Sequence, residues 1–195
     1  MPETTRLFIS IPICPETAPE AYDFLSTRRE QFLSGSWAKR VRWVAPEQFH
    51  LTLRFLDQVA TAQIPDLAGR LQNSIKDIYC FTLTIKQPCL FPRASRAKLI
   101  ACPVEHGSEL KQLRRRVHAA CAAPSESDNS TPENDRYRAH ITLGRIRPSS
   151  TRSKAPNLPS FPGEATLRVG QIDIVASLPF HEGVRHEVLH RITLP

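Results

Sequence analysis

No stretch of this 195-residue chain holds the roughly 20 consecutive apolar residues that a membrane-spanning helix needs. The first residues also lack a basic segment followed by a long apolar one, so we expect no secretory signal peptide. Both absences argue against a membrane as a partner of this protein.

Glycine is scarce, with seven residues, and none of them forms a glycine-rich phosphate-binding loop. Expected strands and helices also fail to alternate strictly along the chain, which argues against a doubly wound nucleotide-binding fold. No serine or cysteine lies in a local signature of a catalytic nucleophile. The function therefore has to come from other residue types.

The five cysteines are scattered, and no two of them form a C-x-x-C pair. This spacing argues against a disulfide framework and against a zinc site, and it favours a reducing cytosol. We therefore expect a cytoplasmic protein. The cysteines are Cys14, Cys80, Cys89, Cys102 and Cys121.

Positive charge exceeds negative charge, with 26 Lys and Arg against 19 Asp and Glu, for a net charge of +7. A basic surface attracts polyanions, including RNA and phosphorylated substrates. The densest basic run, residues 114–116, lies in an expected helix and is most simply a solvated face. The charge therefore supports a nucleic-acid partner without identifying one.

Hydrophobic periodicity predicts helices at about 18–33, 64–77 and 110–121, the first opened by a capping-box pattern of Thr17 and Glu20. Alternating or continuous apolar stretches predict strands between them. Polar, turn-rich segments at 124–135 and 148–163 predict long loops. The expected strands cover residues 6–13, 41–44, 49–56, 81–85, 98–104, 139–146, 170–178 and 186–194. We expect one α+β domain over residues 1–195, built from two similar lobes with antiparallel sheets, outer helices and a central cleft.

Two near-copies stand out within the expected strands, His50-Leu51-Thr52-Leu53 and His140-Ile141-Thr142-Leu143. By chance, the seven histidines would give on the order of 0.1 such matches. Successive strand side chains point to opposite faces, so His50 and Thr52 share one face, and so do His140 and Thr142. The repetition predicts two His/Thr pairs that meet at the junction of the lobes.

Two histidines facing one cleft suit acid–base chemistry at phosphorus, because one can accept a proton while the other donates one. The threonine hydroxyls can donate hydrogen bonds to phosphoryl oxygens. Two histidines without nearby acidic residues or cysteines supply too few ligands for zinc, so we expect no metal and no cofactor. His186 and His190, four residues apart in one expected strand, are interpreted as ordinary strand residues on one face.

Two arginines continue the motif strands and are candidate phosphate contacts. Simple alternation places Arg54 on the face of His50. It places Arg145 on the opposite face from His140, unless the strand bulges near Gly144.

At these residues the chain resembles the 2H phosphoesterase superfamily, and more narrowly the RNA 2′,3′-cyclic phosphodiesterases, also called 2′-5′ RNA ligase-like proteins. The resemblance rests on RWVAPEQFHLTLRFL and YRAHITLGRI, with support from the opening strand RLFISIPIC and the closing strand HEVLHRITL. It implies a bilobal fold and metal-independent opening of a 2′,3′-cyclic phosphate to a 2′-phosphate, with 2′-5′ ligation in some members.

The resemblance further implies a general acid at His50, a base at His140, and phosphoryl contacts from Thr52 and Thr142. The implied partners are RNA ends or nucleoside 2′,3′-cyclic phosphates, including tRNA fragments. Two alternatives remain open, namely action on a smaller cyclic phosphodiester and a tRNA-binding module in which catalysis is secondary. Nothing in the sequence demands more than a monomer.

Overall fold

The computed structural model describes residues 3–105, 107–122, 137–148, 157–180 and 183–195. Three α-helices and ten strands make up this part of the chain. The helices are α1 (Pro19–Leu33), α2 (Ile64–Ile75) and α3 (Ser108–Cys121). The strands are β1 (Thr4–Pro12), β2 (Val41–Trp43), β3 (His50–Ala60), β4 (Phe81–Ile85), β5 (Cys89–Phe91), β6 (Leu99–Glu105), β7 (His140–Ile146), β8 (Ala165–Val169), β9 (Gln171–Phe180) and β10 (Gly183–Thr193). None of these helices is long and apolar enough to cross a membrane.

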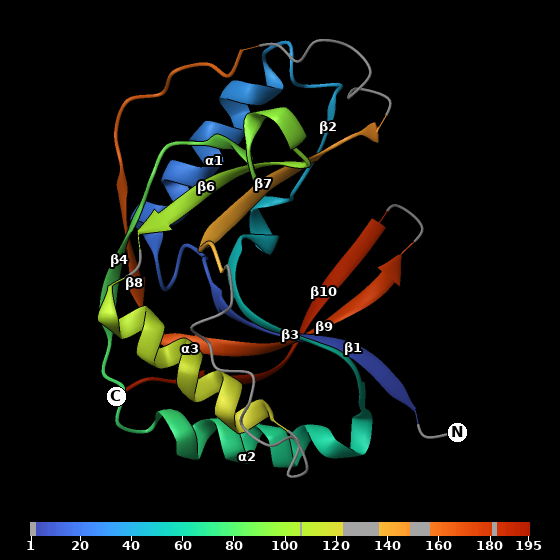
Figure 1. The fold of residues 1–195 in the computed structure, drawn as a ribbon, viewed down its shortest axis with the longest axis vertical. Coiled ribbons are helices and arrows are strands. Elements are labelled where there is room, and N and C mark those ends of the chain that lie inside the picture. Colours follow the sequence, from blue (N-terminus) through green and yellow to red (C-terminus); the bar gives the residue numbers. More distant parts are fainter. Residues whose placement is uncertain (1–2, 106, 123–136, 149–156, 181–182) are drawn as a thin grey trace.

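All ten described strands belong to one sheet, in the order β10-β9-β1-β3-β7-β6-β4-β8, with β2 beside β7 and β5 beside β6. Every strand pair is antiparallel. Helices α2 and α3 lie against the half that contains β1, β3, β9 and β10, whereas α1 lies against the half that contains β6 and β7 (Figure 1). This arrangement confirms the expected antiparallel α+β fold with outer helices, although the two expected sheets form one continuous sheet.

The two halves of the sheet meet at the two motif strands. Strands β3 and β7 pair through a single residue pair, Leu51 with Ile141. Residues directly opposite each other in a sheet point to the same face. Leu51 and Ile141 are both buried on the side of the helices. Their sequence neighbours His50, Thr52, His140 and Thr142 therefore share the other face, which we call the motif face.

A β-bulge follows the threonine of each motif. In β3, Thr52 lies opposite Ser10 and Arg54 lies opposite Ile9, so Leu53 is the extra residue. In β7, Thr142 lies opposite Ala101 and Gly144 lies opposite Ile100, so Leu143 is the extra residue. A bulge shifts the alternation by one residue. It therefore reverses which of the following side chains reach the motif face.

The hydrophobic core lies between the sheet and the helices and follows the predicted periodicity. In α2, the buried side chains are Leu67, Ala68, Leu71 and Ile75, all on one side of the helix. The predicted elements are confirmed, with ends that differ by a few residues. Strands β5 and β8 were not predicted, and β5 has only three residues.

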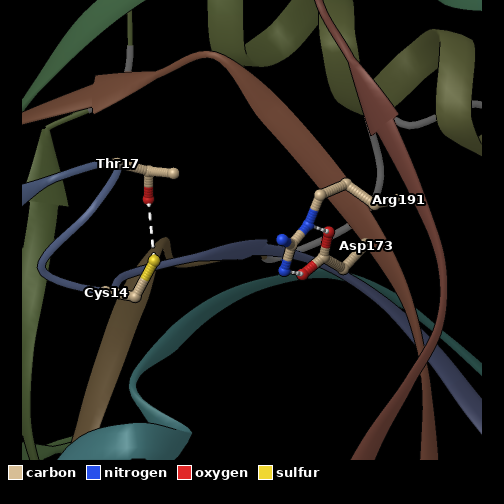
Figure 2. A network of polar contacts seen from close by, with 4 residues as sticks. All are labelled: Cys14, Thr17, Asp173 and Arg191. Atoms are coloured by element: carbon tan, nitrogen blue, oxygen red, sulfur yellow. Dashed lines mark hydrogen bonds and ion pairs between the residues drawn. The ribbon is translucent and has the colours of Figure 1, made fainter.

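The predicted capping box at the start of α1 is wrong. The N-cap is Ala18, which makes no side-chain capping bond. Thr17 instead bonds Cys14, with 3.1 Å between Oγ1 and Sγ (Figure 2). The Glu20 carboxylate accepts a hydrogen bond from the backbone N–H of Thr166 in β8, so it joins the helix to the sheet.

The loop predicted at 124–135 lies outside the described residues, as does half of the loop predicted at 148–163, residues 149–156. The described end of the second loop packs beside α1. Phe161 is buried and meets Phe32 with 5.1 Å between ring centroids. Arg28 donates a 2.6 Å hydrogen bond to the Pro162 carbonyl. This end of the loop therefore contributes to the core.

Candidate active site

The motif histidines open β3 and β7 and are held in the same way. His50 Nδ1 lies 2.7 Å from the carbonyl oxygen of Gln48, and His140 Nδ1 lies 2.8 Å from that of Arg138. A carbonyl oxygen only accepts, so each Nδ1 carries the hydrogen. Each ring therefore keeps the lone pair of Nε2 for chemistry, a tautomer fixed by the carbonyl two residues earlier.

The threonines of the motifs stand beside these rings. Thr52 and Thr142 are half-buried on the motif face, while the leucines that follow them are buried. Apolar anchors beneath short polar side chains restrict the movement of both strands. Two imidazoles and two hydroxyl donors are therefore collected on one face at the junction of the two lobes.

The two imidazoles differ in what surrounds them. The ring of His50 lies 5.0 Å from that of Phe8 and 5.3 Å from that of His186, the latter edge-on. The ring of His140 stacks on Phe91, with 4.2 Å between centroids. Packing against rings and strands takes His50 further out of water than His140.

Burial lowers the pKa of His50 from its ordinary value of 6.5 to about 4, although the bond to the Gln48 carbonyl opposes this shift. Burial also lowers the pKa of His140 and the pKa of His186. The positive charge of Arg145 lowers the pKa of all three histidines further. At neutral pH the unliganded site therefore holds neutral imidazoles beside a fixed cation.

Arg145 reaches this site because of the bulge at Leu143. After the extra residue, Arg145 pairs with Leu99 and lies on the motif face. Simple alternation would place Arg145 on the face opposite His140, and the bulge near Gly144 is what brings it to the same face. Glycine at position 144 lets β2 pack against β7 at this bulge, since a Cβ there would overlap Val41 of β2.

The expectation that Arg54 shares the face of His50 is wrong. The bulge at Leu53 pairs Arg54 with Ile9, whose side chain is buried on the helix face. Arg54 Nη1 accordingly donates a 2.6 Å hydrogen bond to the carbonyl of His118 in α3. Phe55 takes its place on the motif face and is 70% exposed.

His186 was missed because its position depends on strand pairing. It lies opposite Ser177 in β9, and a bulge at Leu189 separates it from His190. The expectation that both histidines share one face is therefore wrong. Of these two histidines, it is His186 whose ring contacts that of His50.

A hollow on the motif face adjoins His50 and is lined by Phe8, Ser10, Asp173 and His186, among others. Asp173 is 1% exposed, and Arg191 binds both of its carboxylate oxygens at 3.0 and 3.2 Å (Figure 2). This ion pair gives the hollow a polar side. Among the described residues, no three His, Cys, Asp or Glu side chains come together as metal ligands would.

Two solved structures share the fold over nearly the whole chain. A Thermus thermophilus protein, TT0787, matches with a TM-score of 0.77 at 19% identity, over 96% of this chain and 97% of its own. E. coli LigT complexed with ATP matches with a TM-score of 0.72 at 21% identity, over 98% of this chain and 99% of its own. At these identities the likeness establishes the fold alone.

Two curated relatives are named RNA 2′,3′-cyclic phosphodiesterase. The Thermotoga maritima protein is 24% identical over 142 residues, which are 73% of this chain and 70% of the relative. The Aeropyrum pernix protein is 25% identical over 156 residues, which are 78% of this chain and 85% of the relative. The family model of LigT-like phosphoesterases matches residues 17–101, a segment that includes the first motif. The chain is therefore similar to the LigT-like phosphoesterases, in line with the resemblance noted in its sequence.

Proposed function

We propose that the protein is an RNA 2′,3′-cyclic phosphodiesterase that opens a terminal cyclic phosphate to a 2′-phosphomonoester, without a metal ion. One observation carries the proposal. Two His/Thr pairs lie on one face of the sheet, and each imidazole has its Nδ1 bonded and its Nε2 available. The activity named for the curated relatives supports the same reaction.

In this reaction a water oxygen attacks phosphorus and the bond from phosphorus to O3′ breaks. His140 takes the proton from the water, and His50 gives a proton to the departing O3′. The phosphate remains on O2′. Thr52 and Thr142 donate hydrogen bonds to the phosphoryl oxygens, where charge grows in the transition state. Arg145 balances the charge of the phosphate. When the 5′-hydroxyl of a second RNA end attacks in place of water, the same step joins a 2′-5′ linkage with the histidines in the same roles. Its reversal cleaves that linkage with the two roles exchanged.

The acid role places a demand on His50, whose pKa of about 4 leaves it neutral near pH 7. A nearby negative charge favours the imidazolium form. His50 can therefore act as the acid only if the negative charge of the bound cyclic phosphate favours its protonated form. We propose that substrate binding raises the pKa of His50, so that the acid is loaded only in the complex.

The natural substrates we propose are RNA ends with a 2′,3′-cyclic phosphate, such as tRNA fragments, met by a monomer in the cytosol. A net charge of +7 supports an RNA partner. Nucleoside 2′,3′-cyclic phosphates and oligonucleotides of increasing length, compared by kcat/KM, test the size of the substrate. A preference for the nucleoside alone would point instead to a small cyclic phosphodiester.

The decisive experiment incubates the purified protein with 2′,3′-cyclic AMP in EDTA and separates 2′-AMP from 3′-AMP. We expect 2′-AMP alone. His50→Ala and His140→Ala should each lower the rate by about 10²- to 10⁴-fold. His190→Ala serves as the matched control, because His190 is an exposed histidine on the helix side of the sheet.

Three results would contradict the proposal. One is 3′-AMP as the product, another is loss of activity in EDTA, and the third is parental activity in both motif variants. Tight tRNA binding with a steep salt dependence and no turnover would instead favour a binding module.

A further inference from the structure

The junction between the two motif strands is narrow. One residue pair, Leu51 with Ile141, is the whole ladder between β3 and β7. Any transition state held by both His/Thr pairs depends on the distance between these strands. Beyond Leu51 the backbone of β3 bulges, and Thr52 pairs with Ser10 of β1 but with no residue of β7 in the described part of the chain.

Side chains bond the backbone of β3 at this bulge. The hydroxyl of Tyr137, three residues before His140, donates a 2.9 Å hydrogen bond to the carbonyl of Thr52. Arg114 Nε of α3 donates to the next carbonyl, that of Leu53, at 3.4 Å. The segment that leads into the second motif thus bonds the carbonyl of Thr52, and helix α3 bonds the next carbonyl, that of Leu53.

Arg114 also holds the ring of Tyr137. Its guanidinium carbon lies 3.4 Å from the centroid of that ring, a cation–π contact. Arg114 is only 8% exposed, and its Nη2 lies 3.3 Å from Nε2 of His118, which accepts the bond because a guanidinium only donates. A buried, multiply bonded cation leaves the phenol ring little freedom, so its hydroxyl stays at the Thr52 carbonyl.

We propose that Tyr137, held by Arg114, is a positioning residue that sets the distance between the two His/Thr pairs. The hydroxyl of Tyr137 ties the backbone of Thr52 to the start of β7. Without this tie, the junction relies on the pair of Leu51 with Ile141. The catalytic part of this inference rests on the proposed function, whereas the structural tie does not.

The test compares Tyr137→Phe with Tyr22→Phe, both of which remove one phenolic hydroxyl. Tyr22 packs against Phe49, next to His50, and its hydroxyl makes no hydrogen bond within the described residues. We expect Tyr137→Phe to lower kcat for 2′,3′-cyclic AMP about tenfold with KM nearly unchanged, because small misplacements of catalytic groups are costly. Tyr22→Phe should match the parent.

A double-mutant cycle separates positioning from a general loss of stability. In a Thr52→Val background, the loss caused by Tyr137→Phe should shrink to about twofold, because the group it positions is gone. In a Thr142→Val background the loss should stay near tenfold. Equal losses in all three backgrounds, or parental activity in Tyr137→Phe, would overturn the positioning role.

Hydrogen exchange tests the tie even if the parent hydrolyses no cyclic phosphate, an outcome that would refute the proposed function alone. Tyr137→Phe should speed exchange of the backbone amides of residues 51–53 and 140–142 at least fivefold relative to the parent, and Tyr22→Phe should not. Unchanged exchange in Tyr137→Phe would overturn the inference whatever the activity.

Discussion

The low pKa of His50 makes the stability of this protein depend on pH in a defined window. In the unfolded chain a histidine titrates near its ordinary value of 6.5, whereas in the folded protein burial brings the pKa of His50 to about 4. Between these values the unfolded chain binds the proton and the folded protein does not. The free energy of unfolding therefore rises with pH across the window and is lost as the pH falls from 6.5 towards 4.

The size of the loss follows from the pKa difference. One pKa unit corresponds to about 1.4 kcal/mol, so the gap between 6.5 and about 4 sets an upper limit of roughly 3 kcal/mol. Because His50 keeps part of its surface exposed to water, which screens its charge, we expect a loss of about 2 kcal/mol in the free energy of unfolding. The lowered pKa values of His140 and His186 add to the loss in the same direction.

A His50→Asn variant isolates the contribution of His50. The Asn amide can still donate to the Gln48 carbonyl but does not titrate. Urea unfolding of the parent and the variant, followed by Trp fluorescence from pH 4.5 to 7.5, should show a shallower pH dependence in the variant. NMR titration of the His50 ring gives its pKa directly. A midpoint near 6.5 in the folded protein, or parallel stability curves, would refute the reasoning.

Three further predictions concern the surroundings of the site. Arg145→Gln should raise the pKa of the three histidines measured by NMR, because its charge lowers all of them; unchanged values would place Arg145 too far away. Asp173→Asn should lower the free energy of urea unfolding by about 1–2 kcal/mol, because it weakens a bidentate pair whose carboxylate is buried but whose Arg191 side chain is 51% exposed. Gly144→Ala should cost about 1–3 kcal/mol in the same assay, since its Cβ would overlap Val41. If Asp173→Asn or Gly144→Ala were as stable as the parent, the corresponding contact would not contribute to stability as argued.

Sequence periodicity predicted the helices and most strands because their apolar positions repeat over many residues. The buried face of α2 is a direct example. It also predicted that His50 shares a face with Thr52, and His140 with Thr142, since alternation holds over two residues. Strand β5 escaped because three residues carry too little pattern, and the capping box failed because Thr17 bonds Cys14 instead.

The errors at the site share one physical cause, which is the bulge. A bulge depends on pairing with a neighbouring strand, so local sequence rarely announces it. Alternation therefore placed Arg54 on the motif face, where the structure has Phe55. The pairing of β10 with β9 likewise decides that His186, and not His190, contacts His50. The contact of His186 with His50 joins residues 136 positions apart, beyond the reach of periodicity.

The two motif strands repeat one backbone design with different side chains. Each histidine bonds the carbonyl two residues before it, and each threonine is followed by a one-residue bulge. In both strands the bulge brings the fifth residue after the histidine to the motif face. That residue is Phe55 in one strand and Arg145 in the other. The shared backbone matches the positions of the two imidazoles, while burial lowers the pKa of both, that of His50 to about 4. The lowered pKa leaves His50 neutral in the unliganded site, so the acid role proposed for it depends on the negative charge of a bound phosphate.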